Sequence, residues 1–167
     1  MENSVHLNSI LAIDIKRCTG CRNCELACSA AHTGTFNPRR SRVQVLKDEV
    51  RNMILPVVCL QCEKPLCAGS CPTLAIAKNS KDILVVDDEL CIGCKDCMAA
   101  CIYGGIVMDP PTGRAIKCDL CQGDPVCVKA CPYAAIVMLP AKPDGARERY
   151  GGIETLSSSY GLVKEEA

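Results

Sequence analysis

The chain has 167 residues, with 19 basic and 19 acidic side chains, 16 cysteines, no tryptophan and one phenylalanine. Setting the cysteines aside leaves roughly 66 apolar residues, about 39% of the chain, below the usual share of about 45–50%. A large hydrophobic core is therefore excluded, and we expect disulfides or metal to hold one domain, or two very small ones, together.

The cysteines organise the chain into four groups of four. Group one is Cys18, Cys21, Cys24 and Cys28; group two is Cys59, Cys62, Cys67 and Cys71; group three is Cys91, Cys94, Cys97 and Cys101; group four is Cys118, Cys121, Cys127 and Cys131. Groups one and three have the C-x2-C-x2-C-x3-C run of bacterial ferredoxins, and groups two and four insert two or three residues before the third cysteine. Structural zinc sites instead combine two separated pairs, so this spacing predicts iron–sulfur clusters.

The elements between the groups are predicted to be short. In chain order we expect strands over 10–15, 42–46, 53–58, 83–87 and 114–117, and helical turns over 22–32 and 95–102. A repeated segment follows the last cysteine of three groups and predicts a turn that caps a cluster, followed by a strand. Its copies begin Cys71-Pro-Thr-Leu-Ala-Ile76, Cys101-Ile-Tyr-Gly-Gly-Ile106 and Cys131-Pro-Tyr-Ala-Ala-Ile136. Residues 141–167 are rich in Gly, Ser and charge and predict an extended tail, either mobile or lying on a partner.

The pairing of the groups follows from reach along the chain. In two-cluster ferredoxins the fourth cysteine of each run binds the other cluster. Only 20 positions separate Cys71 from Cys91, room for one hairpin, so groups two and three are expected to form an inner unit, 59–101. Groups one and four would form an outer unit, 9–58 with 102–140. The alternative, one with two and three with four, is disfavoured by the 30 residues between Cys28 and Cys59.

This pairing predicts the ligands of each cluster. The four sets are Cys18, Cys21, Cys24 with Cys131; Cys118, Cys121, Cys127 with Cys28; Cys59, Cys62, Cys67 with Cys101; and Cys91, Cys94, Cys97 with Cys71. The predicted fold is α+β, with two pseudo-symmetric ferredoxin-like 2[4Fe–4S] units, one nested inside the other, and an extended C-terminal tail expected to contact a partner.

Catalytic motifs are absent from the sequence. It contains no G-x-G-x-x-G, no Walker loop and no C-x3-C-x2-C triad, and His6 and His32 are isolated and expected at the surface. We therefore predict no catalytic residue in this chain, and a role in moving single electrons between sites on other subunits. No basic helix or helix-turn-helix pattern supports a cluster-based DNA-binding sensor.

Targeting signals are also absent. The first nine residues lack a basic n-region and an apolar segment, and no apolar segment follows Arg39-Arg40, so neither secretory nor twin-arginine export of the chain itself is predicted. Export on a signal-bearing partner stays open. No run of 18 apolar residues exists, so membrane insertion is not expected. We expect a cytoplasmic protein with reduced thiols, where metal ligation is favoured over disulfides.

The four groups, in this order, resemble the four-cluster iron–sulfur subunits of molybdenum and tungsten oxidoreductases. That set includes subunits of dimethyl-sulfoxide reductases, formate dehydrogenases and hydrogenlyases, and the carbon-monoxide-dehydrogenase-associated ferredoxin. The resemblance covers residues 9–140. The segment His32-Thr-Gly-Thr-Phe-Asn-Pro-Arg-Arg-Ser-Arg42 is similar to the polyferredoxin subunit of tungsten aldehyde oxidoreductase complexes.

The resemblance implies four [4Fe–4S] clusters and a role in anaerobic metabolism. It implies a large catalytic partner with a tungsten- or molybdenum-pterin, of the aldehyde oxidoreductase type, and a further partner with FAD that exchanges electrons with NAD; neither cofactor would belong to this chain. Alternatives are a free-standing polyferredoxin, or the electron-transfer subunit of a carbon monoxide dehydrogenase, formate dehydrogenase or hydrogenase complex. End-to-end self-association is conceivable.

Charged residues beside the cysteines have two interpretations. Lys16, Arg17, Lys64, Lys95, Lys117 and Lys129 either raise cluster potentials or are solvated, and Arg39, Arg40 and Arg42 either dock an acidic partner or face solvent. With thiolates and clusters counted, the loaded protein would carry about −8 charges, which argues against nucleic acid as a partner.

Overall fold

The computed structural model describes residues 9–50 and 52–140, so the predicted tail, 141–167, lies outside the described residues. The elements are short and mix helix with strand, as the α+β prediction requires. In chain order they are β1 (Ser9–Ile13), η1 (Ile15–Arg17), α1 (Asn23–Thr33), η2 (Pro38–Arg40), β2 (Val43–Asp48), β3 (Met53–Val58), α2 (Leu66–Gly69), β4 (Ile76–Lys78), β5 (Leu84–Val86), α3 (Asp96–Ala100), β6 (Ile106–Met108), β7 (Ala115–Lys117), η3 (Leu120–Gly123), α4 (Val126–Lys129) and β8 (Ile136–Pro140).

The predicted elements are confirmed with shifts of a few residues at their ends. β3 has the predicted bounds, and α1 and α3 occupy the predicted helical turns. In each of the three repeated segments a strand begins at the expected isoleucine: β4 at Ile76, β6 at Ile106 and β8 at Ile136. The helices α2 and α4 and the three 3-10 turns were not predicted, because they are too short to show an apolar period.

The strands pair into four separate two-stranded antiparallel sheets. β4 and β5 form the short hairpin expected between Cys71 and Cys91. β2 and β3 form a longer hairpin in the segment between groups one and two, and β6 pairs with β7 in the same way between groups three and four. The remaining pair joins distant parts of the chain: β1 lies against β8, with Ile13 opposite Ile136.

Two hydrophobic cores occupy different parts of the molecule. The larger core contains Val43, Val58, Leu120 and Ile136, and five of its twelve buried members are cysteines. The smaller core contains Ile76, Leu84, Ile106 and Ala115 with Cys67 and Cys97. Because cysteines replace so many aliphatic side chains, each core is built around thiols.

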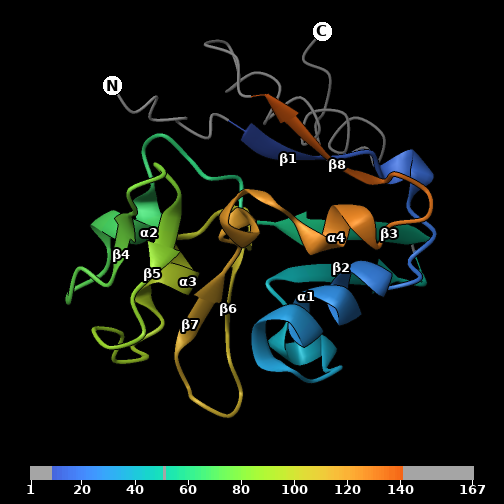
Figure 1. Ribbon diagram of the computed structural model, residues 1–167. Coiled ribbons are helices and arrows are strands. Elements are labelled where there is room, and N and C mark those ends of the chain that lie inside the picture. The colour runs from blue at the N-terminus through green and yellow to red at the C-terminus, as the bar shows by residue number, and fades with distance from the viewer. Residues whose placement is uncertain (1–8, 51, 141–167) are drawn as a thin grey trace, which may run out of the picture.

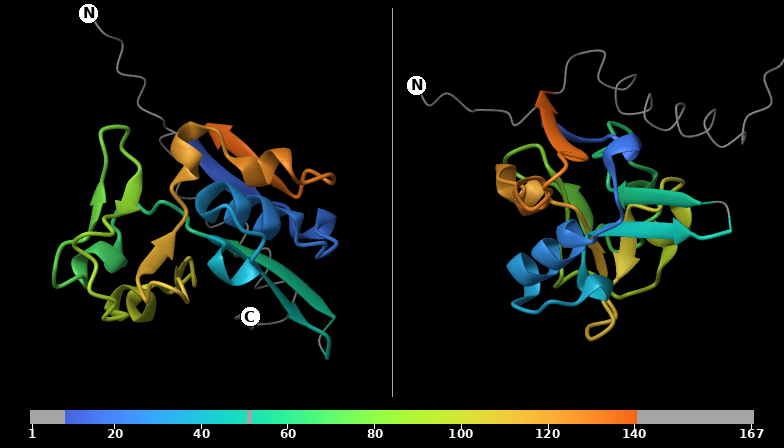
Figure 2. Two further views of the ribbon diagram at one scale, coloured as in Figure 1. Left: turned by 60° about the horizontal axis from the view of Figure 1, so that its bottom comes forward. Right: turned by 90° about the vertical axis from the view of Figure 1, so that its right-hand side faces the viewer.

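The ribbon views separate the parts that carry these cores. Figure 1 shows α2, α3, β4 and β5 together on the left, and α1, α4, β2 and β3 on the right, with the β1–β8 pair above them. In the left view of Figure 2 the green segments lie apart from the blue ones, and both views show the β2–β3 hairpin reaching from the middle of the molecule to its edge. β6 and β7 lie between the two halves, and their residues Ile106 and Ala115 pack in the smaller core.

Candidate metal centres

All sixteen cysteines lie among the described residues, and none of them forms a disulfide. Seven are buried, at positions 24, 28, 59, 67, 97, 118 and 127, whereas Cys21 and Cys94 are exposed. Sixteen free thiols, many of them buried, are a donor set for metal rather than a disulfide framework.

Two hollows in the surface are each lined by four cysteines drawn from two groups. The first is lined by Cys71 together with Cys91, Cys94 and Cys97. The second is lined by Cys131 together with Cys18, Cys21 and Cys24. In both hollows the single cysteine is the last of its group and the other three are the first three of theirs.

The eight cysteines outside these hollows are more deeply placed. Five of them are buried, whereas only two of the eight that line the hollows are buried. Cys67 lies close enough to Cys59 and Cys101 for their charges to interact. Cys127 and Cys118 interact in the same way with each other and with Cys28. The structure therefore brings the last cysteine of each group near cysteines of another group.

Charge interactions also link different sets. Cys118 interacts with Cys59, and Cys127 interacts with Cys24. The set of Cys118 therefore lies near both the set of Cys59 and the hollow of Cys24.

Backbone N–H groups point at the cysteine sulfurs in a repeated pattern. In the three repeated turns, the N–H four residues after the cysteine donates to its Sγ: Ala75 to Cys71 at 3.3 Å, Gly105 to Cys101 at 3.3 Å and Ala135 to Cys131 at 3.2 Å. Such donors stabilise negative charge on sulfur and are a means of setting cluster potential.

Group one lacks this turn, because α1 continues past Cys28 to Thr33. The N–H of Arg42, fourteen residues further on, donates to Cys28 Sγ at 3.3 Å instead. The segment that separates groups one and two therefore supplies the donor that the helix cannot.

The loops between the first two cysteines of each group share a left-handed turn. Gly20, Gln61, Gly93 and Leu120 occupy equivalent positions and all have positive φ. At Gly93 the space is also restricted, because a Cβ there would overlap the carbonyl oxygen of Gly113 in the β6–β7 loop. This hairpin also covers the neighbouring hollow, where Ala115 N–H donates to Cys91 Sγ at 3.4 Å.

Burial keeps several of these thiols protonated in the absence of metal. It raises the pKa of Cys24 and of Cys127 to about 12, and that of Cys67 to about 11. At Cys71 and Cys131 burial also acts to raise the pKa, but hydrogen bonds from the repeated turns outweigh it and lower the pKa. Metal binding at the buried thiols must therefore release protons.

His32 does not lie at the surface as an isolated residue, so that prediction is wrong. It is half-buried, with Nε2 3.7 Å from Cys121 Sγ and 3.6 Å from Asp119 Oδ1. Burial and the neighbouring Arg42 lower the pKa of His32, against the attraction of Asp119. The contact joins α1 to group four across 89 positions, and nothing in the local sequence signals it. His6 lies outside the described residues.

The predicted charged residues divide by burial. Lys117 is buried, whereas Lys16, Arg17, Lys64, Lys95, Lys129 and Arg39 are exposed. Arg40 pairs with Asp109 at 2.7 Å and Arg42 with Asp119 at 2.5 Å, so these two arginines connect distant parts of the fold.

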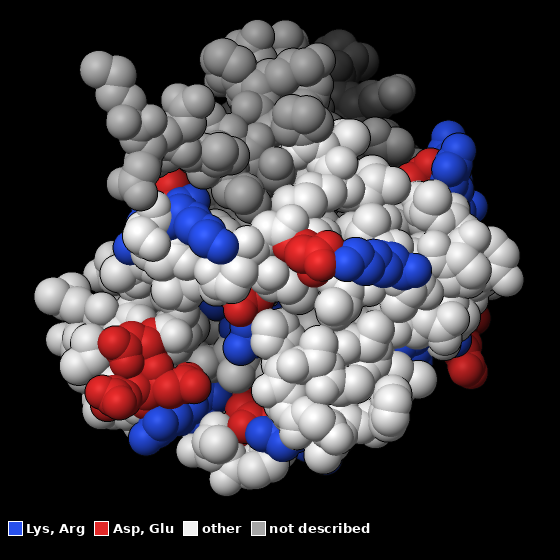
Figure 3. All heavy atoms as spheres, in the orientation of Figure 1, with Lys and Arg blue, Asp and Glu red and all other residues white. Residues whose placement is uncertain are grey.

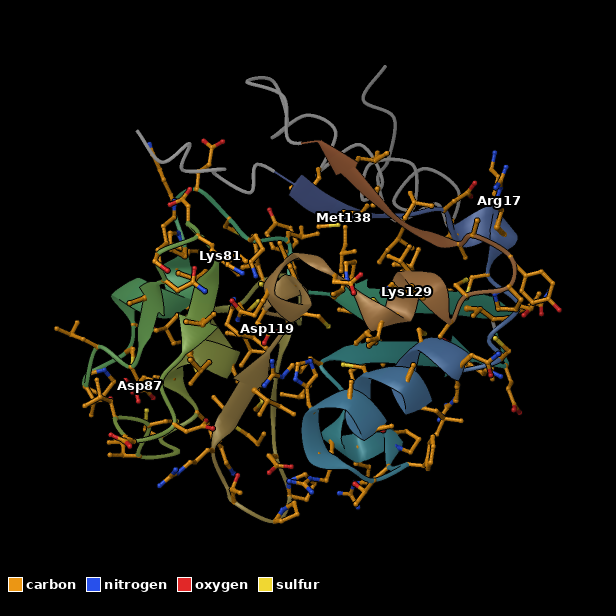
Figure 4. All side chains as sticks on the ribbon, viewed as in Figure 1. Arg17, Lys81, Asp87, Asp119, Lys129 and Met138 are labelled. Carbon is orange, nitrogen blue, oxygen red and sulfur yellow. The ribbon has the colours of Figure 1, made fainter. Side chains whose placement is uncertain are left out.

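In Figure 4, Asp119 lies near the centre of the molecule, whereas Arg17 and Asp87 lie on opposite sides.

This donor set suits iron–sulfur clusters. Four thiols from two groups line each hollow, and backbone N–H groups donate to several of the sulfurs. These features define an iron–sulfur protein.

The similar proteins define the family. Residues 50–141 match the 4Fe–4S dicluster domain family. The chain is 35% identical over 109 residues to a tetrathionate reductase subunit of Archaeoglobus fulgidus, covering 65% of this chain and 53% of that protein. It is 39% identical over 122 residues to the putative electron transport protein YsaA of Escherichia coli, covering 68% and 76%. It is 35% identical over 119 residues to a polypeptide of the anaerobic dimethyl sulfoxide reductase of the same organism, covering 64% and 58%.

One solved structure is also similar in fold. The complex BamBC of benzoyl coenzyme A reductase, with benzoyl-CoA, contains a chain with a TM-score of 0.50 and 28% identity, covering 90% of this chain and 89% of that one. The present protein belongs to the 4Fe–4S dicluster domain family. Its predicted resemblance to oxidoreductase electron-transfer subunits of the dimethyl-sulfoxide reductase type is confirmed.

The chain spans about half the length of the tetrathionate reductase subunit that it matches. In the part of the chain that the structure describes, every helix is too short or too polar to cross a bilayer.

Proposed function

We propose that this chain is a non-catalytic electron-transfer subunit of an oxidoreductase complex and that it holds four [4Fe–4S] clusters. The observation that carries the proposal is the convergence of cysteines from different groups, seen most directly in the two four-cysteine hollows. A bound [4Fe–4S] cluster takes up and returns one electron at a time. The chain's own residues would hold each cluster through thiolates, shield it by burial and stabilise its charge with backbone N–H groups.

The proposed ligands are the crossed sets expected from the sequence. They are Cys18, Cys21, Cys24 and Cys131; Cys118, Cys121, Cys127 and Cys28; Cys59, Cys62, Cys67 and Cys101; and Cys91, Cys94, Cys97 and Cys71. The neighbours of Cys24, Cys67, Cys97 and Cys127 support these sets. The charge interactions of Cys118 with Cys59 and of Cys127 with Cys24 support a row in which the hollows form the two ends.

We propose the nested arrangement of two ferredoxin-like units on the same basis. The pairing of β1 with β8 supports an outer unit that closes around the inner one. The packing of Ile106 and Ala115 in the smaller core favours counting β6 and β7 with the inner unit, whereas the sequence assigned residues 102–140 to the outer one. The tail, 141–167, is proposed as a partner contact.

Opposite charges beside the two hollows favour two different redox partners. Exposed Lys16 and Arg17 directly precede Cys18 and follow Asp14, whereas the four residues before Cys91 are Asp87, Asp88, Glu89 and Leu90. In Figure 3, acidic side chains gather at the lower left, where Figure 4 labels Asp87, and basic ones at the upper right, where it labels Arg17. Charge of opposite sign steers different partners to each end.

The proposed partner at one end is a catalytic subunit with a tungsten- or molybdenum-pterin, of the aldehyde oxidoreductase type, in the cytoplasm of an anaerobic cell. A subunit with FAD that exchanges electrons with NAD is proposed at the other. The opposite charges would also allow copies to associate end to end. The alternatives stay a free-standing polyferredoxin and a subunit of a carbon monoxide dehydrogenase, formate dehydrogenase or hydrogenase complex.

The experiment that tests the proposed function has two parts. The protein is expressed from its native promoter and purified anaerobically. The holoprotein is then titrated with a one-electron reductant. We expect a large catalytic subunit to copurify and each cluster to take up one electron. A stable monomer that exchanges electrons with several enzymes would favour the free polyferredoxin, and a protein that takes up no electrons would contradict both.

A further inference from the structure

Lys117 is an unusual lysine, because it is buried where the two halves of the molecule meet. It is the last residue of β7 and directly precedes Cys118, and only 2% of it is exposed. Burying an ammonium group is expensive unless other groups compensate its charge. The position therefore calls for an explanation beyond packing.

Hydrogen bonds fix the Lys117 ammonium at the junction between groups two and four. Its Nζ donates to the carbonyl oxygens of Leu84 and Cys118. The Gln61 side chain donates from Nε2 to the same two carbonyls, at 3.3 and 2.7 Å, and accepts from Leu84 N–H at 2.8 Å. Gln61 lies between Cys59 and Cys62, so this network ties together the loops that carry two proposed clusters.

The charge of Lys117 is balanced by sulfur rather than by carboxylate. Within residues 9–50 and 52–140, none of the ion pairs involves Lys117. The nearby carboxylate of Asp119 forms its ion pair with Arg42 instead. Burial and the charges of Cys59 and Cys101 raise the pKa of Cys67, and Lys117 is the charged neighbour that lowers it. The ammonium thus stabilises negative charge on the sulfurs of this set.

We propose that Lys117 raises the reduction potential of the cluster held by Cys59, Cys62, Cys67 and Cys101. A transferred electron would then reside preferentially on this cluster, at the junction between the halves. This inference rests on the proposed function. Reduction adds one negative charge to the cluster, and a fixed positive charge in a low-dielectric site stabilises the reduced state. The two end clusters, in the surface hollows, should feel it least.

The test is a potentiometric titration of the loaded, full-length protein followed by electron paramagnetic resonance. The signal of the cluster is assigned beforehand with Cys62→Ser. At fixed ambient potential, Lys117→Met should lower the ratio of reduced to oxidised cluster about tenfold, equivalent to 59 mV for a one-electron couple. Lys117→Arg, which keeps the charge, should restore most of the ratio.

Two controls separate charge from structure. Lys64→Met removes a charge beside the same cluster from an exposed site, and it should change the ratio less than about twofold, because solvent screens it. Gln61→Asn removes hydrogen bonds to the same carbonyls without changing charge, and it should lower stability more than potential. If Lys117→Met fails to load clusters, Lys117→Gln takes its place.

The outcomes distinguish the two proposals. The role of Lys117 would be overturned if Lys117→Met left the ratio of reduced to oxidised cluster unchanged, or if Lys64→Met or Gln61→Asn lowered that ratio equally. Neither result would affect the proposed function, as long as the wild-type protein holds four clusters. A wild-type protein without clusters would overturn the proposed function itself.

Discussion

Arg40 and Asp109, 69 residues apart, form a two-pronged ion pair between η2 and the end of β6. Arg40 Nε donates to Asp109 Oδ1 at 2.7 Å, and Nη2 donates to Oδ2 at 3.1 Å. Asp109 is buried and also accepts from Thr112 Oγ1 at 2.9 Å. The pair therefore fastens the turn before β2 to the hairpin that covers the smaller core.

Asp109→Asn should weaken this connection. The hydrogen bond from Arg40 holds the pKa of Asp109 below its usual range, so the stability that it contributes is present above the unfolded pKa, near 4, and is lost as pH falls through the folded value. We expect the melting temperature of the loaded variant to fall by roughly 4–8 °C at pH 7. The difference from wild type should persist down to about pH 5, which is above the unfolded pKa and above the acidic range that destroys the clusters.

The matched control for this pair is Asp124→Asn. Asp124 also accepts from a cation, Lys129, at 2.5 Å, but both side chains are well exposed. Exposed pairs contribute little, so its melting temperature should match wild type. Equal effects of the two substitutions would show that the pair with Arg40 has no special role.

Gly105→Ala should disturb one cluster selectively. Gly105 stands where the other repeats have Ala75 and Ala135, but a Cβ at Gly105 would lie 2.7 Å from Cys59 Cα. The backbone of Cys59 would have to move, and we expect iron content to fall by about a quarter, with loss of the cluster that Cys59 binds. Gly69→Ala, where no atom lies within 4 Å of the added Cβ, is the control and should keep full iron content.

Cys131→Ser tests the crossed assignment. Cys131 lines the hollow of Cys18, Cys21 and Cys24, so the substitution should alter the magnetic resonance signal of that cluster. Cys28→Ser should instead alter the cluster of group four, because the charge of Cys28 interacts with that of Cys127. Signals that change the other way round would show that each group binds its own cluster.

Removing iron should unfold the protein. Cysteines make up five of the twelve buried residues of the larger core and two of the six in the smaller one, so these cores depend on what the thiols bind. We expect chelation under oxygen-free conditions to abolish the cooperative melting transition, and anaerobic reconstitution with iron and sulfide to restore it. An apoprotein that melts like the loaded one would mean that the thiols are dispensable for folding.

Local patterns in the sequence were sufficient to predict most elements. The copies that begin at Cys71, Cys101 and Cys131 predict turns with the same hydrogen bonds, because each contains its own donor and acceptor. The contact of His32 with Cys121 and the pair of Arg40 with Asp109 could not be predicted, since they join residues far apart in sequence. The burial of Lys117 was missed for a related reason: its polar partners are backbone carbonyls, which carry no sequence signal.

The central claim, that the sixteen cysteines hold four [4Fe–4S] clusters, is tested most directly by measuring metal and acid-labile sulfide in anaerobically purified protein. The proposed function predicts about 16 iron atoms and about 16 sulfides per chain. About four zinc ions and no sulfide would contradict it, because a zinc scaffold with four thiolates per ion carries no electrons.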